Sequence, residues 1–303
     1  MALQDSVHYE HTIKSELMLE GTMALSGRPA KLYIKPAKVG TGIHFIRRDI
    51  SNKNPLINAR WNNVSAIKPT YSLGNEDDVY VHRVDCILAA LYCSGIDNAI
   101  IEIDGSEIPY IYNQPANMLQ LIRKTGLTRQ DWEKQVIWIN RNIEVQVHDI
   151  YATFMPYSSL RISFNTEQTA DGDKDKIISF TLPRTESHKH ASHRYVHQIK
   201  TIEERKLISP NKIENITSED ELPCINKSAQ CRADFANSVG IVSILSTLTL
   251  TGLPIMGHLY TNKPNNEILH LLVGKLFDEP HSWSYMSYSD LQNMSSEHIE
   301  EVI

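Results

Sequence analysis

Two groups of side chains could bind a metal or carry out catalysis. Asp85 and Cys86 are adjacent at the expected start of a helix, where free N–H groups and the helix dipole favour an anion or a metal-binding thiolate. The second group consists of four histidines, His188, His190, His193 and His197. His193 and His197 are four residues apart, which is ligand spacing if this segment is helical. With Cys86 the histidines could form a Cys/His zinc site, or Cys86 could act as a nucleophile with a histidine base. A solvated histidine-rich loop and a cysteine packed in the core are the simpler interpretation.

The element that positions Asp85 and Cys86 is a compact helix–strand unit. Apolar residues recur at helical spacing from Ile87 to Tyr92, and Ser94-Gly95 predicts the end of this helix. A β-branched strand over residues 99–103 follows at once, and Asp104-Gly105 predicts a turn after it.

The rest of the chain predicts a second unit of the same kind. Strands are expected at 30–34, 40–48, 136–147, 160–164, 177–182 and 255–260, and helices at 116–126, 232–251 and 265–276. Residues 52–80 predict loops and short strands. The helix, Gly-Leu turn, strand and helix after residue 232 echo the order around residue 85. We therefore predict two domains, residues 1–127 and 128–303, with a histidine-rich insert near 185–215.

Composition indicates an ordinary globular protein. The 303 residues are 41% hydrophobic and 22% charged, and 30 basic against 36 acidic residues give a net charge of −6. This balance argues against nucleic acid as the main partner. The four cysteines form no dense framework, no apolar run reaches the length of a membrane span, and the start lacks the pattern of a signal peptide. We expect a cytoplasmic protein.

Several motifs give the chain a family resemblance. Gly95-Ile96-Asp97-Asn98-Ala99 and Ser106-Glu107-Ile108-Pro109 follow the helix that starts at Asp85. Ser26-Gly27, Lys35-Pro36-Ala37 and Thr41-Gly42-Ile43 precede it in the expected order. In these motifs the chain resembles the zinc-dependent UDP-3-O-acyl-N-acetylglucosamine deacetylases of lipid A biosynthesis, the LpxC type. The resemblance implies an α+β fold in which two similar β-α-α-β sandwich domains face each other across a cleft.

The resemblance also shows where this chain departs from the family pattern. A Glu-His pair, in which the glutamate is the base and the histidine a zinc ligand, is Asp85-Cys86 here. The long second-domain helix should add a His and an Asp four residues apart, yet residues 236–251 contain no His, Asp, Glu or Cys. The step that carries the general-acid histidine is Thr261-Asn262-Lys263-Pro264, and the Arg-Thr-Phe step is His193-Arg194-Tyr195.

Two functional hypotheses follow from these substitutions. The first is a pseudo-enzyme or binding protein without the zinc site, which keeps a cleft for an acylated or sugar-nucleotide small molecule or contacts a protein partner. The second is an enzyme of changed chemistry on an acylated substrate, using Asp85, Cys86, His193, Arg194 and His197. We expect no cofactor, unless zinc binds a rebuilt Cys/His site.

Overall fold

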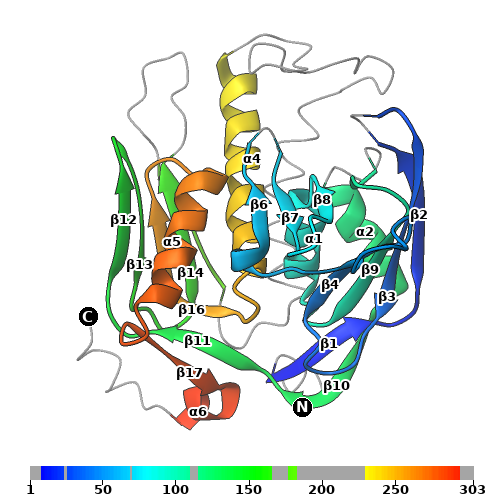
Figure 1. Ribbon diagram of the computed structural model, residues 1–303. Helices are drawn as coiled ribbons and strands as arrows, with labels where there is room; N and C mark the ends of the chain where they lie inside the picture. The colour runs from blue at the N-terminus through cyan, green and yellow to red at the C-terminus, as the bar shows by residue number, and fades with distance from the viewer. Residues whose placement is uncertain are drawn as a thin grey trace.

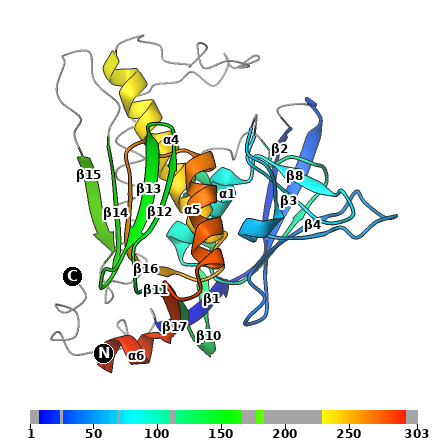
Figure 2. The same ribbon diagram turned by 60° about the vertical axis from the view of Figure 1, so that its left-hand side comes forward.

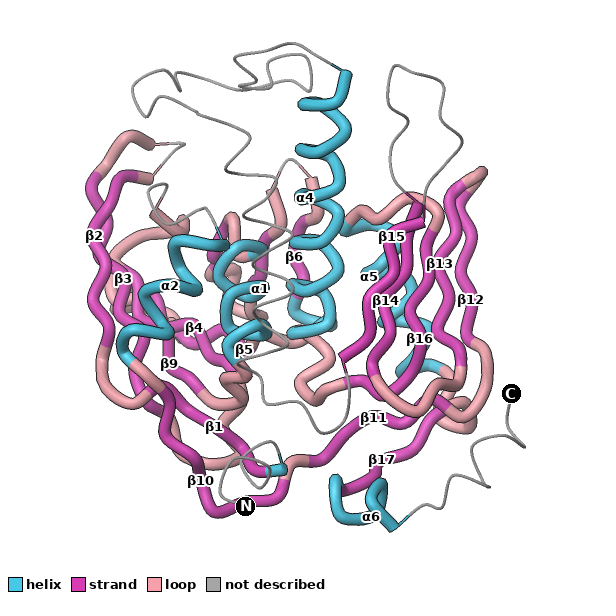
Figure 3. The backbone as a smooth tube through the Cα atoms, turned by 180° about the vertical axis from the view of Figure 1, so that it is seen from behind, coloured by secondary structure: helices cyan, strands magenta, loops and turns pink. Residues whose placement is uncertain are grey.

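The computed structural model describes residues 8–23, 26–68, 70–109, 115–165, 177–182 and 229–293. Two large sheets lie on the outside of the molecule, and the main helices lie between them (Figures 1, 2 and 3). The predicted α+β class is confirmed.

The first half of the chain builds a five-stranded sheet. Its order is β2 (Leu17–Thr22), β3 (Pro29–Pro36), β9 (Ala99–Ile103), β4 (Ile43–Arg47) and β5 (Leu56–Asn58). β9 runs parallel to β4 and antiparallel to β3. A smaller sheet contains β6 (Val64–Ala66), β7 (Ser72–Gly74) and β8 (Tyr80–His82), and the helices are α1 (Asp85–Ser94), α2 (Pro115–Thr125) and the short 3-10 helix η2 (Trp61–Asn63).

The second half builds a seven-stranded sheet. Its main path is β12 (Ile143–Val147), β13 (Ile150–Met155), β16 (Ile255–Thr261), β11 (Gln135–Ile139) and β17 (Trp283–Ser287). β14 (Leu160–Asn165) also pairs with β16, and β15 (Ile177–Leu182) pairs with β14. Its helices are α4 (Ala229–Thr249), α5 (Asn266–Asp278) and α6 (Tyr288–Asn293).

A two-stranded ribbon spans the change from one half to the other. β1 (Tyr9–Ile13) pairs antiparallel with β10 (Leu127–Glu133), which leads directly into β11. The division between residues 127 and 128 stays a prediction; it falls within β10, which is paired with the first strand of the chain.

The predicted helix–strand unit forms as expected. α1 ends where Gly95 takes a left-handed conformation (φ 73°), which brings its N–H to the carbonyls of Leu91 and Tyr92. In β9 the side chains of Ala99, Ile101 and Ile103 are buried, as alternation predicts.

The two halves share one hydrophobic core. Phe45 and Leu88 from the first half belong to the same buried cluster as Phe154 and Leu245 from the second. α1 packs directly on α4, where Thr249 Oγ1 donates a hydrogen bond of 3.0 Å to the carbonyl of Leu88. The start of α1 is therefore held against the middle of the molecule.

One predicted strand is wrong. The segment 136–147 forms two strands, because the chain turns at residues 140–142. β11 pairs in parallel with β16, whereas β12 pairs with β13. No described helix combines the length and the apolar character needed to cross a membrane.

Candidate functional site

The candidate site lies at the first turn of α1. Asp85 begins the helix and is partly buried, and Cys86 follows as a buried thiol that is 7% exposed. Burial raises the pKa of the Asp85 carboxyl, while the backbone N–H of Cys86 and the charge of Arg83 act in the opposite direction. Asp85 is thus a carboxylate that has lost much of its hydration.

A strained arginine precedes this turn. Arg83 has a positive φ of 62°, which is uncommon for a residue with a Cβ. Its Nε lies 3.5 Å from Oε1 of Glu107, whose side chain is 3% exposed. Because backbone strain persists only where surrounding contacts enforce it, this buried ion pair gives a reason for the conformation beside Asp85.

Two buried hydroxyl groups complete the site. Tyr71 is 3% exposed and Thr247, on α4, is 2% exposed. Neither the Tyr71 hydroxyl nor Thr247 Oγ1 makes a hydrogen bond of ordinary geometry within the described parts of the chain. Burial raises the pKa of Tyr71 to about 12; the neighbouring Thr247 hydroxyl lowers it and the Asp85 charge raises it further. Asp85, Tyr71 and Thr247 therefore form one buried polar cluster, which we call the hydroxyl cluster.

The helix that packs on α1 carries small hydroxyl side chains near Asp85. Between residues 239 and 249, α4 carries only aliphatic, glycine, serine and threonine side chains. Ser243 is buried and lies one turn from Thr247, on the same face of the helix.

A hydrolytic zinc needs three protein ligands and an open position. Asp85 and Cys86 are two donors from one helical turn, and no group of three His, Cys, Asp or Glu side chains suited to a metal occurs within the described ranges. Asp85 and Cys86 alone therefore do not make up such a site.

The structure does not describe the other candidate residues from the sequence. His193, Arg194 and His197 fall outside the described residues, as do His188 and His190. A rebuilt Cys/His zinc site therefore stays a prediction. Tyr71 and Thr247 were not predicted, because Tyr71 lies in an irregular stretch, Thr247 in an apolar helix, and only the fold brings them together.

Comparison with known proteins identifies the family. A sequence model of LpxC, UDP-3-O-acyl N-acetylglycosamine deacetylase, matches residues 10–278. The chain belongs to the LpxC family. A relative from Pseudomonas entomophila (strain L48), named UDP-3-O-acyl-N-acetylglucosamine deacetylase, is 28% identical over 93% of this chain and 94% of its own length. Proteins of the same name from Syntrophus aciditrophicus (strain SB) and Idiomarina loihiensis are 24% and 26% identical, over 97% and 93% of this chain and 94% of each relative.

Proposed function

We propose that this LpxC-family protein has lost zinc-dependent deacetylation and keeps the fold to bind an acylated or sugar-nucleotide small molecule. The observation that carries the proposal is the sequence of α4 where this helix packs on α1. Thr247 and Ser243 lie there in a stretch without His, Cys, Asp or Glu. The ligand class comes from the relatives, which are named for a UDP-linked acyl sugar and match nearly the whole chain.

The hydroxyl cluster gives this site a binding chemistry of its own. Buried hydroxyls whose hydrogen bonding is incomplete are costly, so a ligand that supplies further hydrogen bonds to Tyr71 and Thr247 gains affinity there. The Tyr71 hydroxyl and Thr247 Oγ1 can each donate one hydrogen bond and accept others, and Asp85 accepts when it is ionised. Amide and hydroxyl groups of a sugar suit such a set.

A second function is supported by the environment of Asp85. Carboxyls whose pKa is raised by burial are common among catalytic acids and bases. An enzyme of changed chemistry would combine Asp85 and Cys86 with His193, Arg194 and His197.

The decisive experiment combines metal content, turnover and ligand binding on the full-length chain. We expect zinc well below one equivalent, no acetate release from UDP-3-O-acyl-N-acetylglucosamine above the blank, and a higher Tm when that compound is added. Thr247→Val and Tyr71→Phe should reduce the thermal shift. Leu271→Ala, at an exposed position on α5, is the control.

Acetate release at an ordinary enzymatic rate, on the order of 1 per second or faster, would overturn the proposal. Stoichiometric zinc that Cys86→Ala removes, with another group released from the substrate, would favour the second function.

The proposal also includes a cytoplasmic location and is compatible with a protein partner. Cys86 and Cys93 are buried thiols, and burial raises the pKa of Cys93 to about 12. Such thiols fit the reducing cytoplasm. If regulation of another protein is the function, the ligand should change the affinity for that partner.

A further inference from the structure

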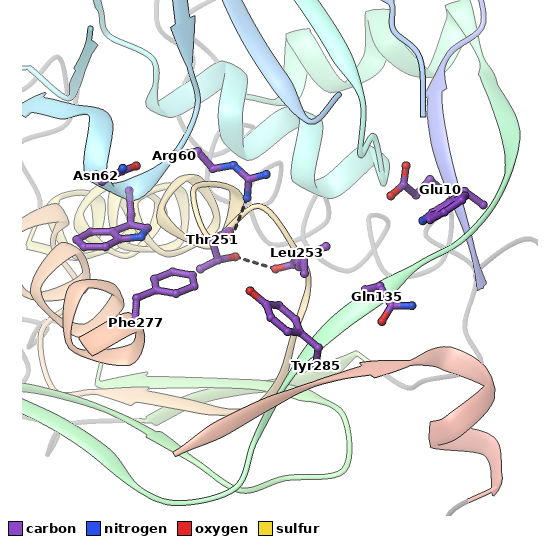
Figure 4. A pocket seen from close by; sticks show the side chains of 10 residues that line it. Glu10, Arg60, Asn62, Gln135, Thr251, Leu253, Phe277 and Tyr285 are labelled. Atoms are coloured by element: carbon purple, nitrogen blue, oxygen red, sulfur yellow. Dashed lines mark hydrogen bonds between the residues drawn. The ribbon is translucent and has the colours of Figure 1, made fainter. Parts of the chain in front are cut away.

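A hollow lies at the junction of the two halves, apart from the hydroxyl cluster (Figure 4). Its volume is about 570 Å³, within the range of small-molecule sites. Ten residues line it: Glu10, Arg60, Trp61, Asn62, Trp132, Gln135, Thr251, Leu253, Phe277 and Tyr285. They come from β1, from η2 and the residue before it, and from β10, β11, the α4–β16 turn, α5 and β17. Only the complete fold therefore assembles this hollow, which we call the aromatic pocket.

Exposed aromatic rings distinguish this hollow from the rest of the described surface. Eight large hydrophobic side chains are exposed in the described ranges, and only two of them are aromatic: Trp132 at 57% and Tyr285 at 60%. Both line the pocket. Large exposed aromatic side chains gathered at one concave site indicate ligand contact rather than chance exposure.

A chain of ring contacts supports the pocket wall. Trp61 stacks on Phe277 with centroids 5.6 Å apart and an interplanar angle of 8°. Phe277 meets Trp283 edge to face at 5.7 Å, and Trp283 meets Tyr285 edge to face at 4.8 Å. These contacts fix the aromatic rings of the wall in the absence of a ligand, which lowers the entropy cost of binding.

Polar groups surround these rings. The side-chain amides of Asn62 and Gln135 and the hydroxyl of Tyr285 make no hydrogen bond to other described residues. Arg60 donates one bond, of 3.3 Å, to the carbonyl of Thr251, so most of its five N–H donors stay available.

The position of Arg60 is built into the fold. A Cβ on Gly252 would come within 1.2 Å of its Nη1, so the guanidinium lies directly on this glycine, which has a φ of 77°. The guanidinium is thus held at the pocket edge by a turn from the other half of the molecule.

The mixed charges around the pocket disfavour strongly charged ligands. The α4 helix ends just before Thr251, and Phe277 lies in the last turn of α5, so two helix C-termini with partial negative charge border the pocket. Glu10 adds a carboxylate, whose Oε2 accepts from the Gly40 N–H and from Asn98 Nδ2. These groups disfavour a phosphate, and Arg60 disfavours a cation.

We propose that the aromatic pocket is a second binding site, for a neutral saccharide of one or two pyranose rings. The C–H faces of such a ring pack on Trp132 and Tyr285, and its hydroxyls bond to the amides of Asn62 and Gln135 and to Arg60. The site uses none of the residues of the hydroxyl cluster, so it can be present whether or not the proposed function holds.

The test uses neutral and charged probes on the full-length chain. Cellobiose and N,N′-diacetylchitobiose are the neutral probes, and glucose 6-phosphate and choline are the charged ones. Tryptophan fluorescence and saturation-transfer NMR should show that at least one neutral disaccharide binds with a Kd of about 1 mM. Trp132→Ala and Tyr285→Ala should each weaken this binding about tenfold. Trp132→Phe should restore part of it.

Leu271→Ala replaces an exposed side chain of α5 outside the pocket and should leave the Kd unchanged. The proposal is overturned if neither disaccharide binds at about 10 mM, if the aromatic variants bind as the parent does, or if a charged probe binds more tightly. A dimer in sedimentation that Trp132→Ala dissociates would also overturn it, because the surface would then join two copies of the chain.

Discussion

At the scale of single residues, Asp85 shows how much of the site the sequence could reveal. Its place at a helix start followed from the apolar spacing after it and from Gly95. Its neighbours could not be predicted, because Tyr71 and Thr247 are separated by more than 170 positions and meet only in the fold. Contacts between residues so far apart in the chain leave no local pattern in the sequence.

Removing the charge of Asp85 should stabilise the protein. Its pKa in the fold is raised, chiefly by burial, above the ordinary value near 4 of the unfolded chain, so the ionised carboxylate disfavours the native state at neutral pH. We expect Asp85→Asn to raise the free energy of unfolding by about 1 kcal/mol at pH 7, in urea titrations. The gain should disappear as the pH falls below about 4, where the carboxyl is protonated in both states.

Asp49 provides the opposite case for comparison. Its hydrogen bonds with Arg47, of 2.8 and 2.7 Å, hold its pKa below the ordinary value. Asp49→Asn should therefore lower stability at pH 7, with the loss shrinking as the pH falls through the pKa range of Asp49. A destabilised Asp85→Asn at pH 7 would contradict the argument and favour a bound cation at Asp85.

At the scale of elements, prediction succeeded where the chain marks its own boundaries. The helices α1, α2 and α4 are each followed by a glycine with positive φ: Gly95, Gly126 and Gly252. It failed for the segment 136–147, where apolar residues resume after the turn in the same alternation. It also missed β10, whose polar sequence gives no strand signal and which forms by pairing with β1.

Two glycines inside helices test how closely those helices pack. A Cβ on Gly240 of α4 would meet Cγ of Pro264 at 2.5 Å, whereas one on Gly274 of α5 would touch Trp61 Cζ3 at an ordinary 3.6 Å. Glycine to alanine normally favours a helix by about 0.5–1 kcal/mol. We expect Gly274→Ala to raise Tm and Gly240→Ala to lower it, in thermal unfolding followed by circular dichroism. Equal gains in both variants would show that α4 can move away from Pro264.

At the scale of the whole molecule, a buried ion pair ties the start of the chain to the β10–β11 junction. Lys134 is 1% exposed, and its Nζ lies 2.8 Å from Oδ1 of Asp97. The other carboxylate oxygen of Asp97 accepts the backbone N–H of His11 at 2.8 Å. Three segments, β1, the α1–β9 loop and the β10–β11 junction, thus meet at one carboxylate.

Replacing only one partner of this ion pair should lower the free energy of unfolding. Lys134→Met leaves the Asp97 carboxylate without its cation, and Asp97→Asn leaves the ammonium group of Lys134 buried. Each variant should lose about 3 kcal/mol of unfolding free energy in urea. The double variant should lose clearly less than the sum, since it buries no unpaired charge. Additive losses would mean that the two groups do not interact energetically.

The C-terminal end of α4 has a consequence for how such a chain can be divided. The carbonyl of Leu250 is satisfied by the backbone N–H of Trp61, and that of Thr251 by Arg60. Both partners come from the first half of the chain, so the end of α4 completes its hydrogen bonding only when both halves are present. A fragment that begins after β10 would contain α4 without these two donors. Such a fragment should therefore fray at the C-terminal end of this helix.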